Sequence, residues 1–204
     1  MSLQAVIARI AQIDQITSPR PPAASTTTGA SGFLTTLDGV QNSSALSTTS
    51  PMTLGSGTAG QRALAAAQAE VGVAEQPPGS NDGPRIADYR TATAGSGVGP
   101  WCAYFTSWAA TQAGAPLGEA GQGFGSVSAL DDWAQRTGRA IPAGNGVAPS
   151  PGDLIVWGGR HIGIVESVDP DGSIHTIEGN SSNAVSRRTY GPDGGGATGY
   201  VRLS

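Results

Sequence analysis

The stretch HIGIVESVDPDGSIHTIEGN, residues 161–180, carries the clearest pattern in the chain. Its two halves alternate between apolar and polar residues and are rich in Ile and Val, which is typical of strands. The turn DPDG, residues 169–172, has the composition of a four-residue hairpin loop, which pairs Val168 with Ser173. The stretch therefore predicts an antiparallel hairpin.

The register of this hairpin brings polar side chains together. It sets Gly163 opposite Glu178 and His161 opposite Asn180, so His161, Glu178 and Asn180 share one face. Gly163 leaves open space beside the imidazole, where Glu178 or Asn180 accepts a hydrogen bond from the ring and sets its tautomer. The other face carries Ile162, Ile164 and Ile177. A slip of one residue would separate Glu178 and Asn180 from His161, so the site depends on this register.

The second histidine, His175, receives no functional role. The same register places it across from Glu166, where an exposed cross-strand charge pair is sufficient explanation. The chain has 2 histidines, and with His175 set aside the candidate general base is His161.

The rest of the folded region shows helical patterns first and strand patterns afterwards. Helices are expected at residues 59–71, 84–90, 100–112 and 126–138. Further strands are expected at residues 153–157 and 200–203. N-terminal helices packed on an antiparallel sheet make an α+β domain, here expected over residues 59–204.

The region before this domain has a different composition. Apolar residues recur at helical spacing over residues 3–16, so an amphipathic helix is expected at residues 1–17. Residues 17–58 include 18 Ser or Thr residues and cannot bury enough apolar surface to offset their ordering entropy. Residues 18–58 are therefore expected to be a disordered linker.

Charge and composition exclude several classes of protein. A formal net charge of -4 and a pI of about 5.0 provide no basic surface for nucleic acid. All 11 basic residues are arginine, which excludes lysine chemistry. The single cysteine, Cys102, excludes an internal disulfide and a multi-thiolate zinc site. No window reaches the length of a membrane span.

Cys102 lies in the first turn of an expected helix that Pro100 begins. The free N–H groups and positive dipole at this helix end favour a thiolate over a thiol. Histidine is suited to take the proton of such a thiol and to return it to a leaving amine. The alternative for Cys102 is a small buried apolar residue, and for His161 a structural strand histidine.

Four blocks of sequence, taken together, resemble the CHAP domain, the cysteine, histidine-dependent amidohydrolases/peptidases. They are PWCAYFTSW (100–108), PGDLIVW (151–157), HIGIVESVD (161–169) and IEGN (177–180). The run PPGSNDGP at 77–84 is also similar to the loop before the cysteine in many bacterial members. The resemblance covers about residues 61–204.

This resemblance implies a papain-like α+β fold and the cleavage of amide bonds in peptidoglycan. It implies that Cys102 is the nucleophile, His161 the general base and acid, and Glu178 and Asn180 the residues that orient it. The backbone N–H of Cys102 is then one oxyanion donor. The resemblance leaves three candidates for the amide that is cut: the muramoyl-L-alanine link, a bond in the stem peptide, or a cross-bridge.

Two tryptophans next to this site have two readings. Trp101 and Trp157 are candidate substrate-binding residues that line a groove, with core packing as the alternative. Trp108 and Trp133 lie at apolar helical positions and are expected in the core.

No metal and no cofactor is expected. Some CHAP domains bind calcium in an Asp-rich loop before the cysteine, but here this stretch offers Asp82 and Asp88 without the alternating spacing of a cage.

Two other functions compete with a wall hydrolase. One is an NlpC-type cysteine peptidase, although these usually carry Asp-Cys-Ser-Gly around the cysteine. The other is a non-enzymatic CHAP-like scaffold that binds wall or a partner.

A wall hydrolase acts in the cell wall or outside the cell. The N-terminus does not match a cleavable signal peptide, because Arg9 lies inside the apolar pattern, so a leaderless route is expected. Residues 1–17 resemble the N-termini of flagellum-associated wall hydrolases, which implies a partner helix or the flagellar export apparatus as partner.

Overall fold

The computed structural model describes residues 57–144 and 146–203 of the 204-residue chain. The helix expected at residues 1–17 and the linker expected at residues 18–58, apart from its last two residues, lie outside this part.

Four helices begin at or close to their expected positions. Thr58 caps the first through a reciprocal pair of hydrogen bonds with Gln61, and the Ser126 side chain accepts from Ala129 N–H to cap the last. The helices are α2 (Ala59–Ala69), α3 (Pro84–Arg90), α4 (Cys102–Gln112) and α5 (Val127–Arg136).

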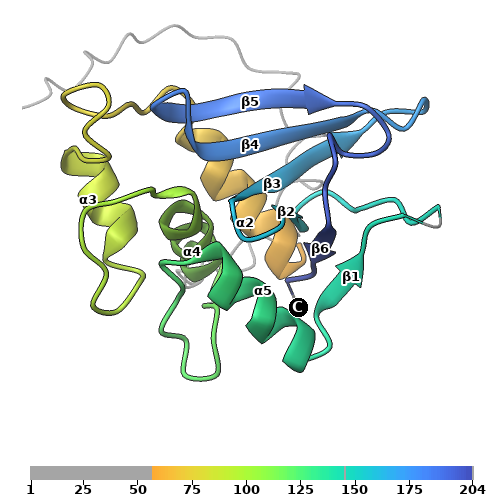
Figure 1. Ribbon diagram of the computed structural model, residues 1–204, viewed down its shortest axis with the longest axis horizontal. Helices are drawn as coiled ribbons and strands as arrows, with labels where there is room; N and C mark the ends of the chain where they lie inside the picture. The colour runs from red at the N-terminus through yellow and green to blue at the C-terminus, as the bar shows by residue number, and fades with distance from the viewer. Residues whose placement is uncertain (1–56, 145, 204) are drawn as a thin grey trace, which may run out of the picture. The chain divides into compact units, whose positions relative to one another are not determined.

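The strands form one antiparallel sheet in the order β1-β6-β2-β3-β4-β5 (Figure 1). They are β1 (Ala140–Pro142), β2 (Leu154–Trp157), β3 (His161–Val168), β4 (Ile174–Ser181), β5 (Ala184–Tyr190) and β6 (Gly199–Val201). The sequence pattern missed β1 and β5. β1 has three residues and ends in Pro142, and β5 exposes Arg187 and Arg188, so neither shows clear apolar alternation. The expected α+β architecture is confirmed.

The hairpin register is correct in the middle of β3 and wrong at its turn. Ile164 pairs with Ile177, as expected. Val168, however, pairs with Ile174 and not with Ser173, because a bulge in β3 shifts the register by one residue. The loop is one residue longer than the turn composition indicated.

The pairing expected for His175 is also wrong. The bulge places His175 opposite Ser167, and its Nε2 lies 2.8 Å from Oδ2 of Asp169. Glu166 instead accepts from Arg187, whose Nε lies 2.8 Å from Oε2. A bulge cannot be inferred from alternation alone. Because of it, His175 pairs with Asp169 and Glu166 pairs with Arg187, in place of the expected His175–Glu166 pair.

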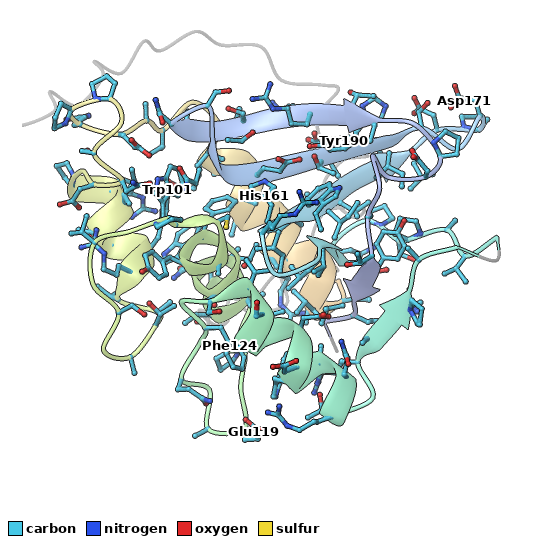
Figure 2. The ribbon with its side chains drawn as sticks, in the orientation of Figure 1. Trp101, Glu119, Phe124, His161, Asp171 and Tyr190 are labelled. Atoms are coloured by element: carbon cyan, nitrogen blue, oxygen red, sulfur yellow. The ribbon has the colours of Figure 1, made fainter. Side chains whose placement is uncertain are left out.

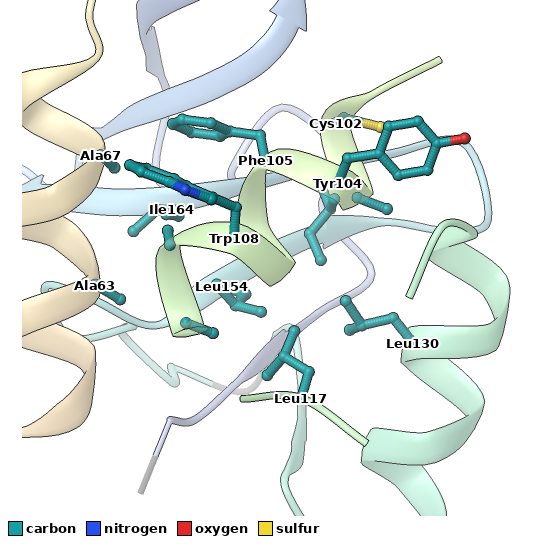
Figure 3. Packing of buried hydrophobic residues seen from close by; sticks show 14 of the residues in the cluster. Ala63, Ala67, Cys102, Tyr104, Phe105, Trp108, Leu117, Leu130, Leu154 and Ile164 are labelled. Carbon is teal, nitrogen blue, oxygen red and sulfur yellow. The ribbon is translucent and has the colours of Figure 1, made fainter. Parts of the chain in front are cut away.

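Apolar clusters form on both sides of the sheet. The larger one lies between the helices and the sheet and includes Ile162, Ile164 and Ile177, the expected apolar face of the hairpin. α4 crosses this cluster (Figure 3). It contacts α2, α3, β3 and β4. Trp108 and Trp133 belong to this core, as expected. The smaller cluster comprises Ile155, Trp157, Val165, Ile174 and Tyr200.

α4 approaches β4 closely because residue 179 has no side chain. A Cβ atom built on Gly179 would lie 2.6 Å from Cβ of Phe105, which is closer than packed atoms can be. This close approach sets the first turn of α4 beside the strand that carries Glu178.

Candidate active site

Cys102 lies in the first turn of α4, as expected, although the helix begins at Cys102 itself and not at Pro100. It is a free cysteine with 4% of its surface exposed. The N–H groups in the first turn of a helix have no partner within the helix, so this end is positively polarised. Such a helix end attracts negatively charged groups.

His161 begins β3 and meets two functional side chains. Its Nε2 lies 2.8 Å from Oε2 of Glu178, and the side chain of Cys102 is the other group that interacts with the ring. Since Nε2 faces Glu178, Nδ1 is the ring nitrogen left for the sulfur. The His161 side chain remains 27% exposed, which leaves the site open to a substrate.

The surroundings of His161 favour its charged form. Burial alone lowers the pKa of this imidazole, but the hydrogen bonds and negative charges of Cys102 and Glu178 outweigh burial and raise the pKa to about 9. The ring is therefore an imidazolium near neutral pH.

Glu178 is held as an anion in a buried place, with 1% of its surface exposed. Its Oε1 accepts from Oγ1 of Thr176 at 2.6 Å and from the hydroxyl of Tyr190 at 2.8 Å. Burial raises the pKa of Glu178. The hydrogen bonds from His161, Thr176 and Tyr190 and the charge of His161 lower it by a larger amount, so the pKa is below its ordinary value.

The space that Gly163 was expected to leave beside the imidazole exists, and the side chain of Glu178 occupies it. A Cβ atom at Gly163 would lie 2.7 Å from Cγ of Glu178, so the carboxylate side chain crosses the strand at the position of the missing side chain. The glycine thus allows Glu178 to reach His161.

An aromatic pair supports the imidazole from the β2 and β5 side. The ring of Trp157 stacks on His161 with centroids 5.4 Å apart, and Tyr190 packs on Trp157 at 5.1 Å. The side chains of His161 and Tyr190 come from β3 and β5 (Figure 2). Nε1 of Trp157 donates to the carbonyl of Gly194 at 2.8 Å. Trp157 is buried and supports the ring of His161 directly.

Sequence reasoning missed Tyr190 because it missed the strand that carries it. β5 has a half-exposed, polar pattern with two arginines, and nothing in that pattern separates Tyr190 from an ordinary edge residue. Its relation to Glu178 arises only from the pairing of β4 with β5.

The structure places Trp101 in the core and not in a groove. It has no exposed surface, stacks on Tyr89 with centroids 5.9 Å apart, and donates from Nε1 to Oε1 of Glu75 at 2.9 Å. A side chain that is fully covered cannot contact a substrate, so the core alternative holds for Trp101.

Asn180 does not join the other site residues through a hydrogen bond. It has a positive φ of 57°, in the irregular part of β4 between Glu178 and Ser181. Among residues 57–144 and 146–203, Glu178 is the residue bonded to Nε2 of His161, and no hydrogen bond links Asn180 to the ring.

The acidic residues before the cysteine form ion pairs with arginine. Asp82 lies 2.7 Å from Arg90, and Asp88 lies 3.2 Å from Arg85. In the described part of the chain, three or more His, Cys, Asp or Glu residues nowhere gather as metal ligands would. Of the helices in that part, each is too short or too polar to span a bilayer.

The comparisons with known proteins found a family-model match and a similar solved structure. Residues 93–180 match the family model described as the CHAP domain. One solved structure, an N-acetylmuramoyl-L-alanine amidase from Staphylococcus aureus, is similar over 55% of this chain and 34% of that one, with 19% identity and a TM-score of 0.42. This chain thus spans about a third of the length of that amidase chain. No curated protein matches the sequence.

Proposed function

Residues 93–180 belong to the CHAP domain family, and from that premise we propose that the protein is a peptidoglycan hydrolase that cleaves an amide bond with Cys102 as nucleophile. One observation carries the proposal: the imidazole of His161 is bonded to Glu178 and also interacts with the side chain of Cys102 at the start of α4. Such a nucleophile, base and orienting group is the arrangement that acyl transfer requires.

The reaction proceeds in two steps. The sulfur anion of Cys102 attacks the carbonyl carbon of the scissile amide, and the imidazolium of His161 gives its proton to the leaving nitrogen as the C–N bond breaks. A water molecule then loses a proton to His161 and attacks the thioester; the C–S bond breaks, which releases the carboxylic acid and restores the sulfur anion beside the imidazolium. The backbone N–H of Cys102 is suited to stabilise the oxyanion.

Glu178 stabilises the imidazolium and fixes the direction in which Nδ1 points. It stays ionised because Thr176 and Tyr190 donate to it. Asn180, with a side chain outside this network, is proposed as a weaker contributor than Glu178.

The family match supports the proposed substrate and location. Peptidoglycan as substrate places the protein in the cell wall or outside the cell. Attachment of residues 1–17 to a flagellar export apparatus is a further part of the proposal, and this segment lies outside the described residues.

Two substitutions test the chemistry. Cys102→Ala and His161→Ala should each lower the rate of solubilisation of purified peptidoglycan by about 1,000-fold or more. The melting temperature should change by only a few degrees. Mass spectrometry of the released muropeptides identifies the bond that is cut.

His175→Ala is the matched control, because this histidine pairs with Asp169 away from Cys102. It should keep the full rate. Undiminished wall cleavage by Cys102→Ala would reject cysteine catalysis, and a wild-type protein that binds wall but releases no fragment would favour a scaffold.

A further inference from the structure

A second buried carboxylate is bonded to the residue that precedes the nucleophile. Glu75 has 2% of its surface exposed, and its Oε1 accepts from Nε1 of Trp101, the residue before Cys102, at 2.9 Å. Its other oxygen, Oε2, has no hydrogen-bond partner among the described residues. The mechanism above uses neither atom.

Trp101 controls where α4 begins. It is the N-cap residue, and its carbonyl accepts the first helical hydrogen bond, from Phe105 N–H at 2.9 Å. No side chain caps this helix. The position of the first turn therefore depends on how the Trp101 ring is held, by stacking on Tyr89 and by the bond to Glu75.

Glu75 is itself fixed to the sheet. Its backbone N–H donates to the carbonyl of Asn183 at 2.9 Å, and Ala74 forms a bridge with Ala184, the first residue of β5. The contacts thus run from the end of the β4–β5 hairpin through Glu75 and Trp101 to the start of α4. The same hairpin carries Glu178 at its other contact with the site.

Stability alone does not explain this pair. A buried oxygen without a partner costs free energy, and a buried Glu–Trp bond replaced by two apolar side chains of similar shape is often neutral. Unsatisfied polar groups that persist in a core tend to lie at functional sites.

We propose that Glu75 is a positioning residue for the nucleophile: through the indole of Trp101 it holds the first turn of α4, and with it the sulfur of Cys102, in register with His161. This inference rests on the proposed function for its meaning in catalysis. The reactivity of the thiol tests it without a wall substrate.

Three single variants separate the hydrogen bond from the fold. Glu75→Met and Trp101→Phe remove one partner each and should lower kcat by about 10- to 100-fold with little change in KM, because small displacements of a nucleophile have effects of that size. Glu75→Gln keeps an oxygen acceptor for Nε1 and should stay within about threefold of wild type, as rescue by the closest analogue.

The chain has one cysteine, so alkylation by iodoacetamide reports on Cys102 alone. Measured at pH 6 and 25 °C, the alkylation rate should fall with kcat in Glu75→Met and Trp101→Phe, and not in Glu75→Gln. Trp133→Phe, the same substitution in the core near α5, is the control for lost packing and should leave alkylation unchanged.

The double variant Glu75→Met/Trp101→Phe decides between positioning and plain stability. It should recover the melting temperature, because no polar atom is then left unpaired, while alkylation and kcat stay low. Recovery of both, or wild-type alkylation in the folded single variants, would overturn the inference. A loss in Glu75→Gln equal to that in Glu75→Met would also overturn it. If alkylation behaves as expected and no variant cleaves wall, the proposed function fails and the positioning role stands.

Discussion

At the scale of single residues, the imidazole of His161 is fixed by contacts that converge on Tyr190. The Tyr190 hydroxyl donates to Glu178, which binds Nε2, and the Tyr190 ring packs on Trp157, which stacks on the imidazole. Tyr190 touches neither the sulfur nor His161 through a hydrogen bond. It supports the base through both of its neighbours.

Tyr190→Phe removes one donor from the carboxylate and keeps the ring. The hydrogen bond from Tyr190 is one of the causes that lower the pKa of Glu178, so that pKa should rise in the variant. Only the ionised carboxylate stabilises the imidazolium, so activity is present above the pKa of Glu178 and lost as pH falls through it. The acid limb of kcat/KM should therefore move to higher pH by up to about one pH unit, equivalent to about 1.4 kcal/mol for the lost hydrogen bond.

The pH dependence of kcat/KM and an NMR titration of the Glu178 carboxyl group measure this effect together. Tyr200→Phe is the control, since Tyr200 lies in the cluster of Trp157 without a bond to Glu178. An acid limb at the wild-type position in Tyr190→Phe would mean that Tyr190 is not needed to keep the carboxylate ionised.

At the scale of elements, the sequence predicted strands with strong alternation. It did not predict elements whose formation depends on pairing with distant parts of the chain. The β3–β4 hairpin and the meeting of His161 with Glu178 could be predicted, because a two-residue period places opposed side chains on one face. The strand β5, the bulge in β3 and the left-handed backbone at Asn180 could not, because each depends on neighbours that are distant in sequence or on local geometry.

Gly163 connects this element to the chemistry. In Gly163→Ala the new methyl group would meet Cγ of Glu178, which must then move away from Nε2 of His161. We expect kcat to fall by about 10- to 100-fold and the free energy of unfolding by about 1–3 kcal/mol. Steady-state kinetics and urea unfolding measure the two effects.

Gly97→Ala serves as the reference, because a Cβ atom at Gly97 has no atom within 4 Å. It should alter neither quantity by much. If Gly163→Ala cleaves wall at the wild-type rate, the carboxylate does not need the path that the glycine opens.

At the scale of the whole molecule, the parts of the site come from separate regions of the sequence. Cys102 lies on α4, His161 and Glu178 on the central hairpin, and Tyr190 on the outer strand. Composition and spacing identified the first three, because each has reactive chemistry of its own. They could not show that Trp101 is fully covered, since burial is a property of the packed molecule and not of the residue type.

The first 56 residues allow a test of where catalysis and localisation reside. A chain that starts at residue 57 keeps Thr58, whose side chain caps α2 with Gln61, and should retain the melting temperature and wall cleavage of the full chain in vitro. A start at Ala59 loses this cap and should be less stable by about 1 kcal/mol. Produced in the native host, the chain from residue 57 should accumulate inside the cell, as immunoblots of cell and medium fractions would show. If it appears in the medium at the level of the full chain, residues 1–56 do not direct export. That result would not bear on catalysis by the folded domain.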